Sequence, residues 1–262
     1  MPAPCSCRMA GPRPDPDVTD RTRLDLALVT RGLAPTRARA RDAILRGCVT
    51  VDGRAANSPA MPVAAAATLA IDDPAGRYVS RAALKLVAGL ERFGYSAEGR
   101  VALDIGASTG GFTEVLLEGG AARVHAVDVG HGQLHPRLAA DPRVVAIEGL
   151  NARELGAAHI PEPVDAVVAD VSFISLRLAL PPGLALARPG SWGVFLVKPQ
   201  FEVGRAHVGK GGVVRDTDRA RQAVDDIAAW LAADMGWTVD GVAPAPIAGG
   251  DGNREYVLGA RK

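Results

Sequence analysis

A cluster of glycines is the part of this sequence best suited to binding a small molecule. Asp104 follows the apolar run Val101–Leu103, and Gly106, Gly110 and Gly111 follow in the same short segment. Glycine permits backbone angles, and a close approach of a ligand, that a Cβ atom would prevent. The order of residues predicts a buried strand, a tight turn and then a helix whose N-terminus faces a ligand. The alternative is a tight turn that binds nothing.

A second acidic residue indicates the class of ligand. Asp128 ends the mostly apolar run Val124–Val127, about 20 residues beyond the turn, where a carboxylate can hydrogen-bond both hydroxyls of a ribose. The glycine order differs from the G-x-G-x-x-G pattern that cradles a pyrophosphate. Asp104 would repel a pyrophosphate but attract a cation. S-adenosyl-L-methionine, which carries an ammonium and a sulfonium, therefore fits better than a nicotinamide dinucleotide.

Lysines are rare in this chain, which makes each of them informative. Of the 30 basic side chains only four are lysines, namely Lys85, Lys198, Lys210 and Lys262. The pKa of a lysine can be lowered until it gives up a proton, which an arginine cannot do. Lys198 ends the apolar run Val194–Val197, and Asp170 ends Val164–Ala169. At one edge of a sheet the pair could act on a hydroxyl proton. The alternative for each residue is a charge that merely meets solvent.

Length and composition limit the classes of protein. The 262 residues, of which 48% are apolar, suffice for one large domain or for a large and a small one. No uninterrupted apolar stretch reaches the roughly 20 residues of a membrane span, and the proline-rich N-terminus lacks the apolar segment of a signal peptide. We expect a cytoplasmic protein with residues 1–20 as a disordered tail. Cys5, Cys7 and Cys48 should be free thiols, without a structural metal.

Basic charge is concentrated in a small N-terminal module. Between residues 21 and 54 there are eight arginines and three aspartates, a local balance of +5. The pattern predicts helices over 24–31 and 37–46, the second capped by Thr36, and a strand Val49–Val51 that enters a turn at Asp52. One helical face would carry Arg37, Arg39, Arg41 and Arg46. Such a face is either solvated or, with so few acids nearby, a phosphate-binding surface.

This module resembles the S4-like RNA-binding domain. The resemblance lies in Arg23-Leu-Asp25, Gly32-Leu33 and Thr36-Arg37, together with Arg41, Ile44, Gly47, Val49, Val51 and Gly53. It implies that the module, with Arg23 among its contacts, binds RNA through backbone shape and phosphates.

The rest of the chain alternates predicted strands and helices. Ser80 could cap a helix that runs to Phe93, and helices also fit 173–180 and 219–233. The further expected strands are 144–147, 192–197, 238–242 and 256–258. We expect an α/β fold, a Rossmann-like doubly wound sheet with its ligand at the carboxyl ends of the strands, joined to the small α+β domain. The expected boundaries are 21–73 for the small domain, 74–79 for a linker and 80–262 for the large domain.

Motifs spread over the large domain resemble the hemolysin-A (TlyA-type) ribosomal RNA 2′-O-methyltransferases, which are similar to FtsJ-like methyltransferases. They are Tyr78-Val-Ser-Arg81 with Lys85-Leu86, Asp104 to Phe112, Asp170-Val-Ser-Phe-Ile174, Val197 to Glu202, Gly211 to Asp216 and Gly252-Asn-Arg-Glu255. The resemblance implies a catalytic tetrad on Lys85, Asp170, Lys198 and Glu255. It places S-adenosyl-L-methionine against Asp104, Gly106, Ser108, Gly110, Asp128 and Asn151. It also implies a ribose, of a cytidine, in the RNA of ribosomal subunits as the substrate.

The chemistry of such a tetrad can be stated independently. A ribose 2′-hydroxyl is a poor nucleophile, and Lys198 could accept its proton, or orient it, while the oxygen attacks a sulfonium methyl in line. Asp170 and Glu255 would hold Lys198 and Lys85 in place, and no metal is required. Glu202 is an alternative to Glu255, since it is also a carboxylate and lies near Lys198 in the sequence.

Two other classes of function compete with this hypothesis. A ribosome-assembly factor could use the basic module and retain the methyl donor only structurally, although the intact tetrad disfavours it. A membrane-active hemolysin would need a spanning or inserting segment, and an arginine-rich helix pair suits RNA better than lipid. The expected linker also lacks the tryptophan that the family often has there, so coupling between the two domains could differ.

Overall fold

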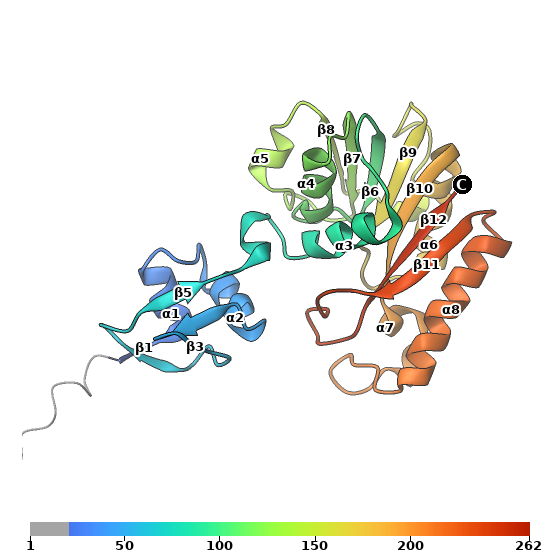
Figure 1. Ribbon diagram of the computed structural model, residues 1–262. Helices are drawn as coiled ribbons and strands as arrows, with labels where there is room; N and C mark the ends of the chain where they lie inside the picture. The colour runs from blue at the N-terminus through green and yellow to red at the C-terminus, as the bar shows by residue number, and fades with distance from the viewer. Residues whose placement is uncertain (1–20) are drawn as a thin grey trace, which may run out of the picture. The chain divides into compact units, whose positions relative to one another are not determined.

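The computed structural model describes residues 21–262, which form two compact units divided after Pro74 (Figure 1). The predicted tail, residues 1–20, lies outside the described residues. The expected linker, residues 74–79, contains a 3-10 turn at Pro74–Arg77, and the next residue, Tyr78, is buried in the core of the second unit. The large unit therefore begins at Ala75 rather than at Ser80.

The first unit is a small α+β domain. Its elements are β1 (Arg21–Arg23), α1 (Leu24–Thr30), α2 (Arg37–Leu45), β2 (Val49–Val51), β3 (Arg54–Ala55), β4 (Pro62–Ala64) and β5 (Leu69–Ile71). Strands β3, β2 and β5 form one antiparallel sheet, and β1 pairs with β4. As predicted, the Thr36 hydroxyl caps α2 by accepting a hydrogen bond from the Arg39 amide at 3.2 Å. Leu24, Leu28 and Ile44 fill the core between the helices and the sheet.

One buried carboxylate ties the two helices of this unit together. Asp25, in the first turn of α1, accepts hydrogen bonds from Arg23 at 3.0 Å and from Arg37, the first residue of α2, at 3.0 Å. The hydrogen bonds from Arg23, assisted by Arg37, lower the pKa of Asp25 to about 2 against the opposing effect of burial. Two of the arginines that gave this module its basic character therefore also hold it together.

The second unit is built on a seven-stranded sheet. Its strands are β6 (Val101–Ile105), β7 (Arg123–Asp128), β8 (Val144–Glu148), β9 (Val164–Ala169), β10 (Ala187–Val197), β11 (Thr238–Pro244) and β12 (Tyr256–Arg261). They are ordered β11-β12-β10-β9-β6-β7-β8. Strands β6 to β10 run parallel, whereas β12 runs antiparallel to both β10 and β11. The Rossmann-like α/β fold predicted from the sequence is confirmed.

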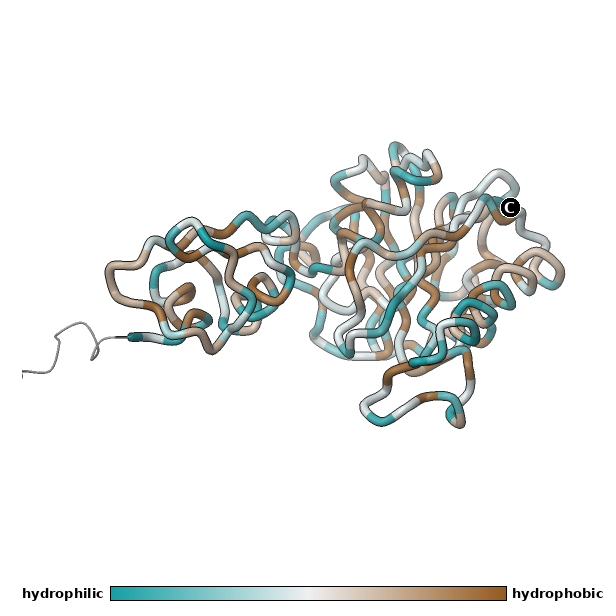
Figure 2. Tube along the Cα trace, turned by 60° about the horizontal axis from the view of Figure 1, so that its bottom comes forward, coloured by the Kyte–Doolittle hydropathy of each residue, from teal (hydrophilic) through white to brown (hydrophobic). Residues whose placement is uncertain are grey.

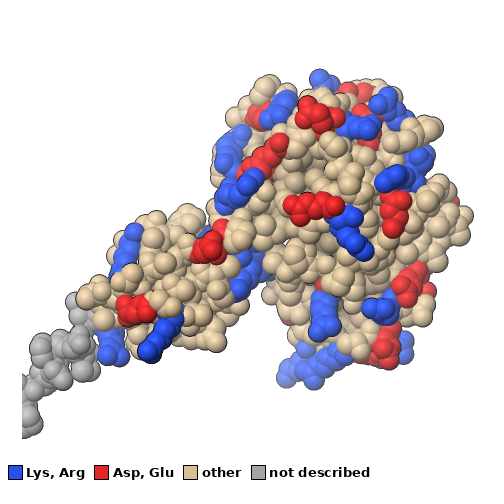
Figure 3. Space-filling view, viewed as in Figure 1, with Lys and Arg blue, Asp and Glu red and all other residues tan. Residues whose placement is uncertain are grey.

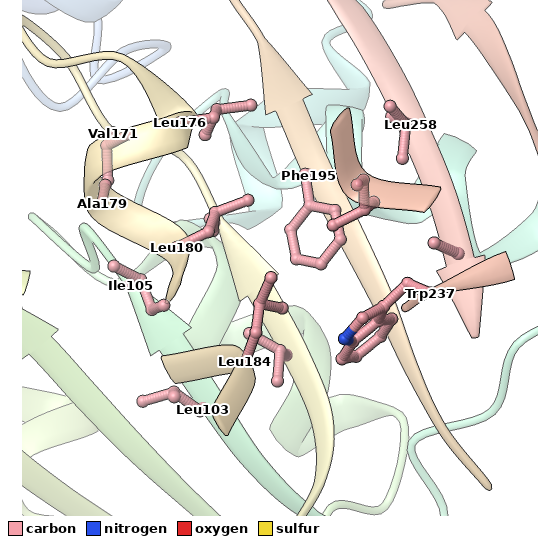
Figure 4. Close-up of a cluster of buried hydrophobic side chains, with 14 of the residues drawn as sticks. Leu103, Ile105, Val171, Leu176, Ala179, Leu180, Leu184, Phe195, Trp237 and Leu258 are labelled. Carbon is pink, nitrogen blue, oxygen red and sulfur yellow. The ribbon is translucent and has the colours of Figure 1, made fainter. Parts of the chain in front are cut away.

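Helices cover both faces of this sheet (Figures 1 and 2). They are α3 (Ala83–Phe93), α4 (Gly111–Glu118), α5 (Pro136–Ala139), α6 (Leu176–Leu186), α7 (Pro199–Glu202) and α8 (Thr217–Ala233), with 3-10 turns at Ala152–Glu154 and Arg205–His207. Side chains alternate along each strand, so Phe195 packs with α6 and α8 around Trp237 (Figure 4). Its neighbours Val194 and Leu196 pack on the other face, with α3 and α4. This two-sided burial explains the apolar strands seen in the sequence.

Two predicted helix starts were wrong. Helix α6 begins at Leu176, not at Phe173, because the Ser175 hydroxyl accepts a hydrogen bond from the Arg177 amide and residues 170–174 form a loop. Helix α3 begins at Ala83, and Ser80 instead accepts a hydrogen bond from the Ala82 amide in the preceding turn. Both segments lead into the candidate active site.

Replacing Asp25 should weaken the first unit at neutral pH. An Asp25→Asn variant loses the charge that joins the two helices and should lower the melting temperature of this unit by about 5 °C. Because folding lowers the pKa of Asp25, its contribution is complete above about pH 4, the unfolded pKa, and is lost as the pH falls toward 2. The advantage of the wild type should shrink over that range.

Hydrogen exchange of peptides from residues 21–73, measured against temperature at pH 7 and pH 3, would test this. Asp72→Asn is the matched control, because Asp72 is an exposed aspartate of the same unit whose side chain forms no hydrogen bond or ion pair within the described residues. A wild-type advantage that is equal at both pH values would contradict the assignment.

Candidate active site

A cleft of about 910 Å³ opens at the carboxyl ends of β6, β7 and β9, where open α/β sheets bind their ligands. It is lined by five residues that the sequence singled out, namely Gly106, Ser108, Asp128, Asn151 and Asp170. They come from three strand ends and from the segment that follows β8. The fold therefore gathers residues spread over 65 positions of the chain into one site.

The carboxylate of Asp128 is held in a fixed orientation at the cleft. Its Oδ2 accepts a hydrogen bond from the Ser108 amide at 2.8 Å, and its Oδ1 accepts one from the Gly130 amide at 2.7 Å. Each carboxylate oxygen retains a second lone pair, so both can still accept from neighbouring hydroxyls. Asn151 is held similarly, since its Oδ1 accepts from the Arg153 amide at 3.1 Å. These groups are preorganised acceptors.

Two residues predicted to contact the cofactor do not line the cleft. Asp104 is fully buried, and its Oδ2 accepts a hydrogen bond from the Thr113 hydroxyl at 2.7 Å, because its side chain points from β6 toward α4. Gly110 is the left-handed N-cap of α4, and a Cβ there would collide with Leu138. Both residues shape the turn from behind the ligand site.

Asp104 nevertheless affects the electrostatics of the cleft. Burial raises its pKa to about 7, and the nearby carboxylates of Asp170 and Asp128 add to the increase. Its Oδ1 has no hydrogen-bond partner among the described residues. A cation bound in the cleft would stabilise this charge, so the residues present fit a cationic, ribose-containing cofactor.

Two buried ion pairs occupy the end of the sheet next to this cleft. Lys198 Nζ lies 2.6 Å from Asp170 Oδ1 and donates a hydrogen bond to the Ser172 hydroxyl at 2.8 Å. Lys85 Nζ lies 2.5 Å from Glu255 Oε2. All four side chains are at least 86% buried. These are the four residues on which the family resemblance placed the tetrad.

The sheet register explains this convergence. In β10, Phe195 lies opposite Ala169 of β9, and Val197 lies opposite Tyr256 of β12. Lys198 follows Val197, and Glu255 precedes Tyr256 in the antiparallel strand β12, so Lys198 and Glu255 lie beside each other. The loop after β9 supplies Asp170. Helix α3 packs on β10 and β12 and contributes Lys85. Residues far apart in the chain meet because the strands end together.

The two candidate glutamates have different partners in the structure. Glu202 accepts hydrogen bonds from the Ser175 hydroxyl at 2.6 Å and the Leu176 amide at 2.9 Å, at the start of α6, and burial raises its pKa. It therefore anchors α6, and Glu255 is the partner of Lys85.

Sequence reasoning missed two residues at this site. Phe173 has a positive φ of 66° and is 91% exposed at the rim of the cleft, with its ring 5.3 Å from that of Phe201. Asn253 is buried beside Glu255 and binds the loop before α8. The available signal for Phe173 was an aromatic residue three positions after Asp170, the first residue of the loop that follows β9. The prediction that a helix begins at Phe173 concealed this signal.

The arginines predicted to bind RNA differ in availability. Arg41 is exposed, and Arg39 is half-buried. Arg23 and Arg37 are about half exposed while also pairing with Asp25. Arg46 is only 15% exposed and is bound by both Asp42, at 2.9 Å, and Asp73, at 2.7 Å. We correct its assignment to a structural ion pair, because two carboxylates offset its charge.

The second unit has a Rossmann-like methyltransferase fold, defined by the doubly wound sheet, its glycine turn and the hydrogen-bond acceptors at Asp128. The same chain also contains a separate small basic domain. Residues 78–262 match the FtsJ-like methyltransferase family, and residues 22–68 match the S4 domain. The chain belongs to the FtsJ-like methyltransferase family, and methyltransferases of this fold use S-adenosylmethionine.

Several relatives align with almost the whole chain. The 16S/23S rRNA (cytidine-2′-O)-methyltransferase TlyA of Mycobacterium tuberculosis is 48% identical over 92% of this chain and 90% of its own length. Hemolysin A of Brachyspira hyodysenteriae is 40% identical over 90% of this chain and 98% of its own length. A solved hemolysin-type structure from Streptococcus thermophilus aligns with a TM-score of 0.72 at 37% identity, covering 94% of this chain and 90% of that one.

Within residues 21–262, none of the helices has the length and apolar character needed to cross a membrane.

Replacing Asp104 should change how stability depends on pH. Because folding raises its pKa from 3.8 to about 7, the folded protein binds more protons than the unfolded chain between these values, and stability falls as the pH rises through them. An Asp104→Asn variant cannot titrate. Its stability relative to the wild type should therefore rise by about 1–4 kcal/mol from pH 4 to pH 7.

Urea unfolding of both proteins at several pH values would measure the difference. Parallel pH profiles for wild type and variant would show that Asp104 does not carry this proton.

Proposed function

We propose that this protein transfers a methyl group from S-adenosyl-L-methionine to the 2′-hydroxyl of a ribose, that of a cytidine, in ribosomal RNA within ribosomal subunits in the cytoplasm. The observation that carries the proposal is the buried pair of Lys198 and Asp170 at the wall of the cleft that also holds Asp128. The names of the relatives in M. tuberculosis and other bacteria supply the substrate class.

The cleft residues account for binding of the cofactor. Asp128 would accept hydrogen bonds from the ribose hydroxyls, Asn151 would lie near the adenine, and Gly106 and Ser108 would line the site with backbone. The buried charge of Asp104 would favour the cationic amino-acid end. When bound, the cofactor supplies an electrophilic methyl group on a sulfonium.

The lysines act on the other reactant. Lys198 would accept the 2′-hydroxyl proton or orient the hydroxyl, while the oxygen forms its bond to the methyl carbon and the carbon–sulfur bond breaks. Asp170 and Ser172 fix the position of Lys198 Nζ, and Glu255 fixes Lys85. The exposed ring of Phe173 offers a flat surface on which a base of the substrate could stack. Arg23, Arg37, Arg39 and Arg41 would bind RNA phosphates from the S4 domain.

The direct test is transfer of labelled methyl groups to purified small subunits, large subunits and naked ribosomal RNA. Nuclease digestion then locates the label on ribose or on a base. Label on ribose supports the proposal and identifies the substrate. Bound cofactor with no label on any RNA would favour the non-catalytic assembly-factor hypothesis.

Replacing Lys198 should abolish methyl transfer without preventing RNA binding. The Lys198→Ala variant should lose at least about 10³-fold in turnover, within the range of a general base, while its affinity for ribosomal subunits stays within about twofold. Lys198→Arg separates the two roles, because arginine can orient a hydroxyl but cannot accept its proton. Single-turnover assays measure the rates, and normal turnover of Lys198→Ala would refute the tetrad.

Replacing Asp128 should weaken cofactor binding and leave RNA binding unchanged. An Asp128→Asn variant loses a charged acceptor for two hydroxyls and should bind S-adenosylmethionine about tenfold or more weakly. Isothermal titration calorimetry measures the affinity. Asp141→Asn, which neutralises an aspartate paired with Arg143 outside the cleft, is the control. Equal affinities of the two variants would remove Asp128 from the cofactor site.

A further inference from the structure

A second pocket lies beside the tetrad. It has a volume of about 410 Å³ and is bounded by the first turns of α8, by residues 213–214 and by residues 252–254. Pro199, the neighbour of Lys198, lines it, and so does Tyr256, the neighbour of Glu255. The pocket thus starts one residue away from two members of the tetrad, and none of its lining residues also lines the cofactor cleft.

Two arginines in this pocket have no partner within residues 21–262. Arg221 and Arg254 line the pocket, are exposed, and form no ion pair or side-chain hydrogen bond in that part of the chain. Many other arginines of the second unit are paired with carboxylates, namely Arg77, Arg123, Arg137, Arg143, Arg188, Arg219 and Arg261. An arginine left open in a concave site is available to an anionic ligand.

The surroundings of the pocket are also basic. Arg205, Lys210 and Arg215, in the segment between α7 and α8, form no ion pair within the described residues. In Figure 3, Lys and Arg side chains lie over this part of the second unit with Asp and Glu side chains among them. The opposing charges include Asp218, which lines the pocket, Asp216, which pairs with Arg219 at 3.6 Å, and the exposed Asp251, which precedes Gly252. The lining itself carries two arginines and one aspartate, so it favours an anion.

Asn253 shapes this pocket in advance. It is 3% exposed, and it accepts a hydrogen bond from the Val214 amide at 3.0 Å and donates one to the Gly212 carbonyl at 2.8 Å. These two hydrogen bonds attach the glycine-rich loop before α8 to Asn253, which lies two positions before Glu255. The pocket wall and the tetrad are therefore built on the same short segment, so a ligand in one is placed relative to the other.

We propose that this pocket binds a backbone phosphate of the RNA strand next to the target ribose, through Arg221 and Arg254. The proposal rests on the proposed function, because a ribose whose 2′-hydroxyl meets Lys198 carries phosphates on its neighbouring oxygens. Phosphate contacts fix the register of a nucleic acid on a protein without reading its sequence. The pocket would place the correct hydroxyl at Lys198, while the S4 domain binds elsewhere on the RNA.

The test uses full-length protein with both pocket arginines replaced by alanine. Arg92→Ala with Arg100→Ala is the matched control, because these arginines of the same unit lie outside both pockets and form no ion pair in the described chain. Methyl transfer to ribosomal subunits gives KM and kcat, and fluorescence anisotropy gives the affinity for a single-stranded RNA oligonucleotide over a salt series.

The double pocket variant should show a KM for the subunits raised about tenfold, the size of one lost charge-assisted contact, with kcat nearly unchanged. The salt dependence of oligonucleotide binding should fall by about one unit per arginine. Replacing both arginines by lysine should restore most of the affinity. A KM and salt slope equal to those of the control variant, or a loss confined to kcat, would overturn the proposal.

The methyl-transfer assay and the oligonucleotide-binding assay together separate this proposal from the proposed function. If the wild type methylates no ribosomal RNA, the proposed function fails, while weaker oligonucleotide binding by the pocket variant still supports the phosphate site. If the wild type methylates RNA but the pocket variant matches the control in both arms, the phosphate site fails and the proposed function stands.

Discussion

The two buried ion pairs of the candidate active site depend on the alignment of β9, β10 and β12 at one end of the central sheet. Because β10 pairs with both neighbours, a shift of one residue in either register would turn Lys198 away from Asp170 or Glu255. A buried lysine also requires a paired charge, since removing one partner leaves an uncompensated ion in a low-dielectric site. The two buried ion pairs thus constrain the strands, and the strands position the ion pairs.

The two pockets of the second unit carry different sets of charges. The cleft is lined by Asp128 and Asp170, with Arg153 and Arg205 also in its lining. Asp104 lies buried behind it, where burial, with the charges of Asp170 and Asp128 adding to the effect, raises its pKa, and these three carboxylates suit a cationic methyl donor. The segment between α7 and α8 is basic and adjoins the same tetrad from the other side. A cation and an anionic polymer could therefore approach the reacting groups without competing for the same surface.

The small unit shows why a count of basic residues does not measure a binding surface. Arg46 is bound by two aspartates, and Arg23 and Arg37 share Asp25. These ion pairs add to the apolar core of a small domain, and a small domain buries a smaller fraction of its surface than a large one. The charge that remains for RNA is smaller than the sequence suggests, and it lies on residues such as Arg41 that point to solvent.

The sequence by itself determined the alternation of strands and helices, the glycine turn and Asp128 at the end of β7. Through resemblance to a family it also predicted, as a tetrad, the four residues that form the two buried ion pairs. These features follow from local periodicity and short motifs. Tertiary structure alone decided that Asp104 lies behind the cleft and that Glu255 rather than Glu202 pairs with Lys85. It also decided that Arg46 forms structural ion pairs and that Arg221 and Arg254 line one pocket. The physical reason is that a side chain's partner depends on strand register and helix packing, which join residues that are distant in the chain and leave no signal in the local sequence.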